Sequence, residues 1–123
     1  MNLLTLTILS VACLNGPSDR LLDAIRQVES SGGVYTVGDG GKAVGPYQLW
    51  KVYVDDVNRI AGTKYTYADR MDEKKSREMV KIYLSHYGNR LTELEMARIH
   101  NGGPKGHKKQ STVKYAEKIK GLL

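Results

Sequence analysis

The stretch that decides the fold is ESSGGVYTVGDGGKAVGPYQ, which runs from residue 29 to residue 48. It begins at the end of a predicted helix, passes through a glycine-rich ribbon, and leads into a second helix. Glycine favours such turns because it has no Cβ and adopts positive φ angles without strain. The stretch carries two carboxyl groups, Glu29 and Asp39, ten positions apart. It therefore predicts a cleft with a carboxyl on a helix end and another on a ribbon, and HNGGPKG at 100–106 is expected to form the facing wall.

Hydrophobic residues recur at helical spacing on both sides of this stretch. Ser18 is expected to cap the first helix, which Gly32 and Gly33 end. The residues from Val34 to Val44 favour a short hairpin. The other elements expected are helices at about 49–61, 72–87 and 92–99, a last helix capped by Ser111 or Thr112, and a helical turn at 66–71. The predicted fold class is α+β, mostly helical, with one small β-hairpin between the first two helices.

Length and composition favour one soluble domain of 123 residues. The formal net charge is +6, which attracts polyanions such as nucleic acid, an acidic cell wall or anionic lipid without choosing among them. Cys13 is the single cysteine, so no internal disulfide can form. Cys/His spacings typical of metal sites are absent from the sequence. We therefore expect neither a metal nor a cofactor.

The first sixteen residues form an apolar run without charge, which differs from the rest of the chain. The run is too short for a stable membrane span. It resembles the apolar part of a secretory signal, although a positive segment before it is missing. The alternative is a buried N-terminal strand or helix of the domain. We expect residues 1–16 to be an export signal, residues 17–123 to be the domain, and the protein to be secreted or exported.

The two carboxyl groups suit the cleavage of a glycosidic bond, which needs one protonated acid and one ionised carboxylate. Glu29 follows the apolar face of its helix and lies at the negative end of the helix dipole, which should raise its pKa. It is therefore the candidate general acid. Asp39, in a polar glycine turn, should stay ionised. The simpler alternatives are a solvated glutamate at a helix end and an aspartate that only forms a turn.

Several segments together resemble the invertebrate-type (i-type) lysozymes, the family that includes destabilase. They are QVESSGG, GDGG, GPYQLWKVYVDD and ARIHNGGPKGHKKQST, and the resemblance covers about residues 22–120. GPYQ and ARIHNGGPKG are the most specific of these segments. The resemblance implies a lysozyme fold, a peptidoglycan substrate, and roles for Glu29 as general acid and Asp39 as second carboxylate.

The resemblance also implies which residues bind the sugar chain. Gln48, Trp50 and Tyr53 fall in the segment that lines the cleft, and His100, Asn101 and Gly102 fall on the facing loop. Amides and aromatic rings suit N-acetyl sugars. Tyr87, at the end of its helix, is expected to reach the same cleft. Core packing for the rings, and hydrogen bonds to the loop backbone for His100 and Asn101, are the alternatives.

The sequence departs from the family in three ways. It lacks the family's many cysteines, and Asp39 lies one residue closer to GPYQ than the family pattern implies. The serines expected on either side of GPYQ for isopeptidase activity are missing, so we do not expect that activity. In a strand, a shift of one residue would turn the Asp39 side chain to the other face.

The function expected from these observations is that of a muramidase, a bacteriolytic enzyme of the cell wall. It would cleave the β-1,4 bond between N-acetylmuramic acid and N-acetylglucosamine with retention, as a monomer that does not bind nucleic acid and has no stable membrane span. A lytic transglycosylase that uses Glu29 alone is one alternative. A lysozyme-fold module that binds wall polymer without cleaving it is another.

Overall fold

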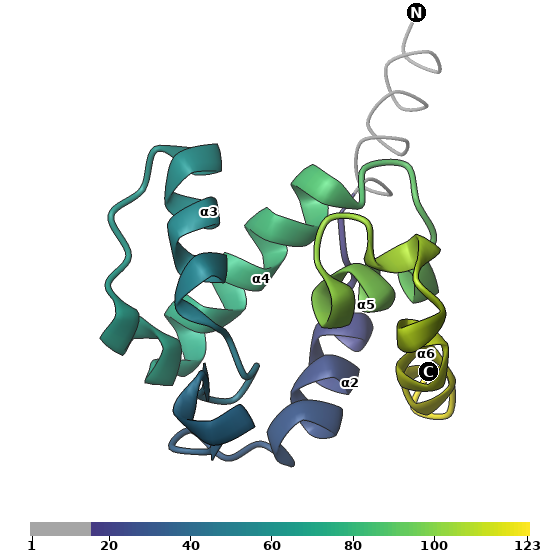
Figure 1. The fold of residues 1–123 in the computed structure, drawn as a ribbon, viewed down its shortest axis with the longest axis horizontal. Coiled ribbons are helices and arrows are strands. Elements are labelled where there is room, and N and C mark those ends of the chain that lie inside the picture. The colour runs from purple at the N-terminus through teal and green to yellow at the C-terminus, as the bar shows by residue number, and fades with distance from the viewer. Residues whose placement is uncertain (1–15) are drawn as a thin grey trace, which may run out of the picture.

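The computed structural model describes residues 16–123 (Figure 1). The predicted export segment therefore lies, except for Gly16, outside the described residues. The helices are α2 (Asp19–Ser30), α3 (Lys51–Ala61), α4 (Glu73–Tyr87), α5 (Glu93–Gly102) and α6 (Val113–Lys120). The two strands are β1 (Val37–Gly38) and β2 (Ala43–Val44), and the 3-10 turns are η1 (Asp39–Gly41), η2 (Tyr67–Met71), η3 (Gly106–Lys108) and η4 (Gln110–Thr112). Within residues 16–123 we find no helix that combines the length and apolar character required to cross a membrane.

The helices begin where the sequence places their caps. Ser18 Oγ accepts a hydrogen bond from the Leu21 N–H at 3.1 Å, and Asp72 Oδ1 accepts one from Lys75 N–H at 2.9 Å. Thr92 and Glu95 form the predicted capping box. These side chains occupy N–H groups that have no partner inside the helix, which fixes each start.

The hairpin is shorter than the prediction of strand from Val34 onward. Only Val37 and Gly38 pair with Val44 and Ala43, in an antiparallel register. The chain before them makes turn hydrogen bonds instead, from Gly33 N–H to Ser30 O at 3.1 Å and from Thr36 N–H to Gly33 O at 3.4 Å. Those bonds use groups that a longer ladder would need. The mostly helical fold with one small hairpin between α2 and α3 is confirmed.

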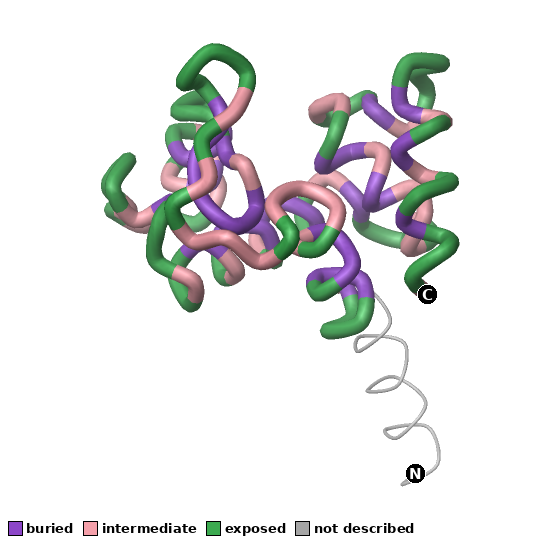
Figure 2. Tube along the Cα trace, turned by 90° about the horizontal axis from the view of Figure 1, so that it is seen from below, coloured by how far each residue is buried: buried purple, intermediate pink, exposed green. Residues whose placement is uncertain are grey.

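The core lies where α4 contacts α2, α3 and α5, and Figure 2 shows the buried positions along the inner sides of the helices. Tyr53 from α3 stacks on Tyr83 from α4, with ring centroids 3.8 Å apart. Residues 16–123 contain no cysteine, so packing rather than disulfides stabilises this domain. The largest fully buried side chains are Leu21, Leu22, Ile25, Tyr47, Leu49, Val54, Val57, Met79, Leu84, Met96, Ile99 and Ile119.

Two predicted boundaries on the C-terminal side were wrong. The helix expected to end near Ile99 continues to Gly102, because Gly103, at φ 89°, is the residue that ends it. His100 and Asn101 therefore lie on the last turn of α5 rather than on a loop. Thr112 precedes α6 but its side chain does not cap it. Its hydroxyl is 2.7 Å from the Gly106 carbonyl oxygen and accepts from Arg98 Nε, so it holds the preceding turns together.

Candidate functional site

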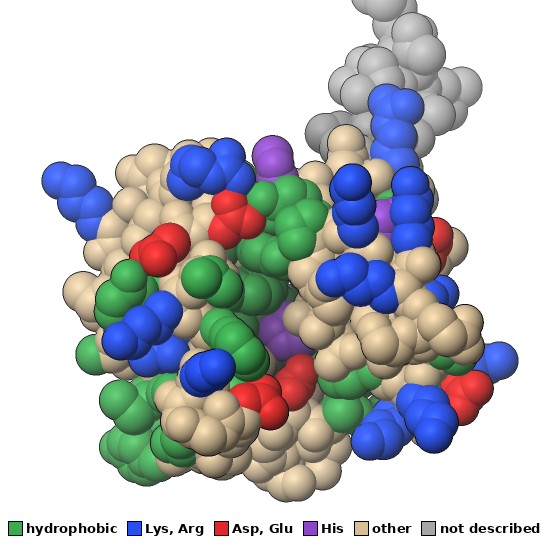
Figure 3. All heavy atoms as spheres, viewed as in Figure 1, with side chains coloured by type: hydrophobic (Ala, Val, Ile, Leu, Met, Phe, Trp, Pro, Cys, Tyr) green, Lys and Arg blue, Asp and Glu red, His purple; other side chains and the backbone are tan. Residues whose placement is uncertain are grey.

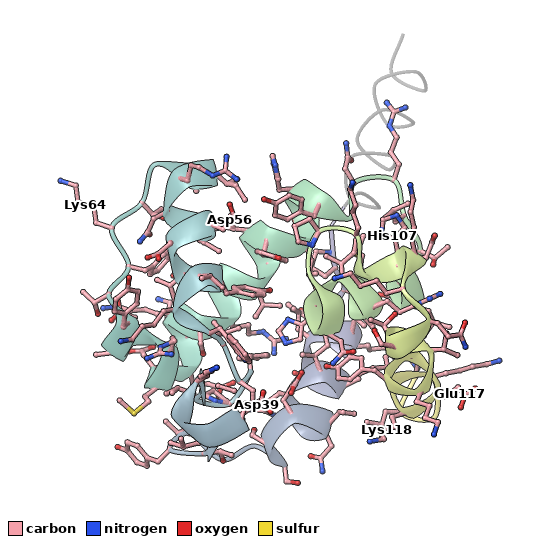
Figure 4. The ribbon with its side chains drawn as sticks, viewed as in Figure 1. Asp39, Asp56, Lys64, His107, Glu117 and Lys118 are labelled. Atoms are coloured by element: carbon pink, nitrogen blue, oxygen red, sulfur yellow. The ribbon has the colours of Figure 1, made fainter. Side chains whose placement is uncertain are left out.

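A cleft of about 550 Å³ runs between the side of the molecule that carries α3 and the hairpin and the side that carries α5. Figure 3 shows it as a hollow with acidic side chains beside a histidine at its lower end. Asp39 lies at that end and Asp56, on α3, at the other (Figure 4). Its lining includes seven residues predicted for the site, namely Glu29, Asp39, Gln48, Trp50, Tyr53, His100 and Asn101.

Glu29 lies in the last turn of α2, and 19% of its side chain is exposed. Its Oε2 accepts a hydrogen bond from the hydroxyl of Tyr115 on α6 at 2.8 Å. The same oxygen is 3.4 Å from His100 Nε2 on α5. Burial, followed by the negative charge of Glu29, raises the pKa of Tyr115 well above its ordinary value, so this hydroxyl keeps its proton. Two neighbouring helices therefore fix one oxygen of this carboxyl group, and Oε1 remains for other partners.

His100 connects Glu29 to the opposite wall of the cleft. Its Nε2 is 3.1 Å from the Tyr47 carbonyl oxygen, which can only accept, so Nε2 carries a proton. Its Nδ1 is 3.2 Å from the Tyr53 hydroxyl, which can donate to it in the neutral ring. Burial, with the charges of Tyr83 and Glu29, raises the pKa of Tyr53 well above its ordinary value. The ring is thereby held in one orientation between the Tyr53 hydroxyl, the Tyr47 carbonyl oxygen and the Glu29 carboxyl group.

Asp39 opens η1, the turn between the two strands, and is exposed. Its φ is 51°, in the left-handed region that Asp and Asn tolerate better than most residues. The turn continues through two glycines at positive φ. A turn does not alternate its side chains between two faces as a strand does, so the register argument about Asp39 does not apply. Asp39 and Glu29 line the same cleft.

Gln48 also has a positive φ, 53°, and its amide is engaged by the backbone. Its Nε2 donates to Thr36 O at 2.9 Å and to Gly45 O at 3.0 Å. A Cβ added at Gly38 would lie 2.5 Å from its Oε1, so a larger residue there would displace this amide. Gln48 therefore holds the hairpin in place at the cleft edge, a role that the spacing of the sequence did not reveal.

The remaining predicted residues fall into two groups. Trp50, 41% exposed, and Asn101, also exposed, offer a ring and an amide to the cleft. Tyr87 and Gly102 are not among its lining residues. The Tyr87 hydroxyl instead donates to Asp56, which does line the cleft. Gly103 and Pro104 also line it, from the HNGGPKG segment predicted as the facing wall, and the lining residues that we did not predict are Val52, Asp55, Asp56, Arg59 and Tyr83.

The described residues do not suggest a metal centre. In the range 16–123, no group of three or more His, Cys, Asp or Glu side chains is arranged to hold a metal ion. The site chemistry that the geometry offers is that of carboxyl groups in a groove lined by rings and amides. One carboxyl, Glu29, is held by its neighbours, and the other, Asp39, is open to solvent.

Comparisons with known proteins find a lysozyme among the proteins that this chain is similar to. No model of a known protein family matches the chain. The chain is 33% identical over 124 residues to a lysozyme of Ostrea edulis, covering 95% of this chain and 90% of that protein. It is also similar to a chain in the crystal structure of Aeromonas hydrophila PliI in complex with Meretrix lusoria lysozyme. There the TM-score is 0.73 at 28% identity, over 85% of this chain and 89% of that chain.

Proposed function

Because this chain belongs to the invertebrate-type lysozyme family, we infer that it cleaves the β-1,4 bond between N-acetylmuramic acid and N-acetylglucosamine. It is a glycoside hydrolase of the lysozyme type, and peptidoglycan is its substrate class. The proposed bond specificity and mechanism rest on the pair of carboxyl groups in one cleft. Glu29 is held by hydrogen bonds, and Asp39 is open to solvent.

In this mechanism Glu29 is the general acid. Tyr115 and His100 both contact Oε2, which leaves Oε1 to carry the proton toward the leaving glycosidic oxygen. An acid must meet its substrate oxygen in one defined geometry, and a carboxyl fixed from two helices is already oriented for that transfer. When the bond breaks, Glu29 becomes an anion, and the Tyr115 hydroxyl stabilises that charge.

Asp39 then meets the positive charge that develops on the sugar ring. In a retaining enzyme the second carboxylate attacks the anomeric carbon, and water later releases the sugar with Glu29 acting as base. The attack forms a carbon–oxygen bond to Asp39 as the bond to the leaving oxygen breaks. An exposed carboxylate in a glycine-rich turn suits this role because the turn lets a sugar approach closely.

The residues that line the cleft suit a polysaccharide substrate better than a small one. The exposed ring of Trp50 and the amide of Asn101 lie along the same groove as the carboxyl groups. Rings stack on sugar faces, and amides exchange hydrogen bonds with N-acetyl groups. Since peptidoglycan lies outside the bacterial membrane, the proposal includes export of the protein and action on the wall.

Tyr115→Phe is expected to lower kcat about tenfold and to leave KM nearly unchanged. The change removes the hydroxyl that holds Glu29 Oε2 at 2.8 Å but no group that lines the cleft. Tyr65→Phe is the matched control, because it removes a hydroxyl that donates to Glu78 at 3.0 Å outside the cleft. Initial rates on purified walls at several concentrations separate kcat from KM. Equal kcat values for the two variants would remove Tyr115 from the mechanism.

Lysis of whole cells should weaken as ionic strength rises, whereas cleavage of a neutral chitin oligomer should change much less. The net charge is +6, and Figure 3 shows Lys and Arg side chains on both walls of the hollow. Salt screens attraction between a basic surface and an anionic wall, with a Debye length of about 10 Å at 0.1 M. Rates for both substrates between low and physiological salt provide the measurement. An identical salt response would show that charge does not steer the enzyme to the wall.

A further inference from the structure

A second cavity, of about 300 Å³, lies beside the cleft on the side of the hairpin turn. Three cations, Lys42, Lys51 and Arg70, line it together with two glycines of the turn. Among the described residues that line it, none is acidic. Trp50 and Val52 line both this cavity and the cleft, so the two are neighbours along one surface.

Arg70 is an unusual cation for its position, because it is only 8% exposed and lacks an acidic partner within residues 16–123. Its Nε donates to Tyr67 O at 2.8 Å, and its Nη1 is 3.1 Å from Leu49 O and 3.4 Å from Lys42 O. These acceptors are neutral, and burial lowers the pKa of Arg70. Its second terminal nitrogen, Nη2, has no hydrogen-bond partner in the described part of the chain. Because Nη2 is not one of the fully buried unpaired atoms of residues 16–123, it is accessible, and an anion in the cavity would complete the partners of this largely buried side chain.

The groups around Arg70 also favour a negatively charged ligand. Lys51 Nζ lies 5.2 Å and Arg70 Cζ 5.7 Å from the centre of the Tyr67 ring, and Lys42 Nζ lies 5.3 Å from that of Trp50. The cations are thus gathered by aromatic faces rather than by carboxylates. The N-terminus of α3 adds further positive potential, since Trp50 provides no side-chain cap and the first turn has no acidic residue. Within residues 16–123, no partner accepts from the N–H of Lys51 or Val52, and free N–H groups at a helix start attract anions.

We propose that this cavity binds a carboxylate of the peptide that peptidoglycan carries on its muramic acid residues, while the sugar chain lies in the cleft. This assignment rests on the proposed function. Asp39 and Asp55 line the cleft and not the cavity, and Asp55 is engaged by the Tyr67 hydroxyl at 2.8 Å. A peptide carboxylate reaches the cavity on the same sugar chain that fills the cleft, and the shared wall at Trp50 gives it a short path. A wall-polymer phosphate has the same oxyanion chemistry, so the experiment separates the two sources.

A binding measurement that does not depend on cleavage uses Trp50, the single tryptophan of the chain, as its reporter. A muramyl dipeptide with free carboxylates is titrated into the Glu29→Gln chain, and tryptophan fluorescence is recorded. Its amidated, uncharged form and inorganic phosphate are titrated in the same way. We expect the free dipeptide to bind at least about tenfold more tightly than the amidated form. Equal affinities for the two dipeptides would overturn the proposal.

The variant for the cavity is Lys42→Gln with Lys51→Gln, because both lysines are exposed and their replacement does not disturb the buried Arg70. The matched control is Lys114→Gln with Lys118→Gln on α6, which removes the same charge from an exposed face (Figure 4). We expect the cavity variant to lose about tenfold in dipeptide affinity and the control to retain it. Equal losses in both would mean that net charge alone is responsible and would overturn the site.

Cleavage of three wall preparations identifies the source of the anion. They are native walls, walls freed of phosphate polymers by hydrofluoric acid, and walls whose carboxylates are amidated. The cavity variant should be about tenfold slower than the unmodified chain on the first two and equal to it on the third. Equal rates on the phosphate-free walls would assign the cavity to phosphate instead and overturn the carboxylate. If the unmodified chain cleaves none of the walls, the proposed function fails, while the fluorescence titration still decides the cavity.

Discussion

Glu29→Gln should lower wall lysis about a thousandfold or more, because it removes the proton that the leaving oxygen needs. Glutamine keeps the shape of the side chain, and its carbonyl oxygen can still accept from the Tyr115 hydroxyl that now contacts Oε2. The fold should therefore persist, with a thermal midpoint close to that of the unmodified chain. Loss of turbidity of a wall suspension measures lysis, and circular dichroism on heating measures stability.

Glu117→Gln is the matched control for this change. Glu117 is an exposed glutamate on α6, away from the cleft (Figure 4). Its replacement alters net charge by the same amount and should leave lysis within about twofold, since an exposed charge outside the cleft contributes little. If Glu29→Gln retained activity within a few-fold of the unmodified chain, the general acid would have to be another residue.

Asp39→Asn should reduce activity by about a hundredfold or more, and the unmodified enzyme should release fragments with reducing ends. A retaining hydrolase needs this carboxylate within about 5–5.5 Å of the acid so that it can attack the carbon whose oxygen the acid protonates. Asparagine suits the turn, because it tolerates the positive φ of 51° at this position almost as well as aspartate. The change therefore removes the charge without remodelling the turn.

Mass spectrometry of the released fragments distinguishes the two possible reactions. A lytic transglycosylase lets the 6-hydroxyl of the sugar attack, which leaves 1,6-anhydro ends and requires Glu29 alone. Asp39→Asn at a near-normal rate, together with anhydro ends from the unmodified enzyme, would replace the hydrolase mechanism with that one. Reducing ends with a strongly impaired variant would support Asp39 as the second catalytic carboxylate.

The local features of the fold could be predicted because neighbouring residues cause them. Ser18, Asp72 and Thr92 cap helices through side chains that reach an N–H three residues on, and such contacts are readable from spacing. Glu29 and Asp39 were likewise expected in one cleft because a short turn joins their segments. The end of α5 was misplaced because the whole of HNGGPKG was read as loop, whereas the helix continues through His100 and Asn101 and ends only where Gly103 adopts a positive φ.

The features that escaped prediction depend on contacts between distant segments. Nothing in the pattern around Tyr115 distinguishes it from an ordinary core tyrosine, yet its hydroxyl meets Glu29 across 86 positions of sequence. Arg70 lies in a short polar stretch that looks exposed, yet carbonyl groups from three segments surround it. The spacing of residues along one helix or strand does not indicate which elements pack together in the fold.

The contact between Glu29 and Tyr115 also bears on when the molecule becomes active during its synthesis. Both proposed catalytic carboxyls lie in the first forty residues, whereas the hydroxyl that holds the acid belongs to the final helix, α6. A chain grows from its N-terminus, so the ribosome makes the acid well before the residue that supports it. An unfinished chain that already carries Glu29, Asp39 and the whole of α3 still lacks the group that orients the acid. The orientation of the acid by Tyr115 is therefore gained only once α6 has been made and has packed against α2.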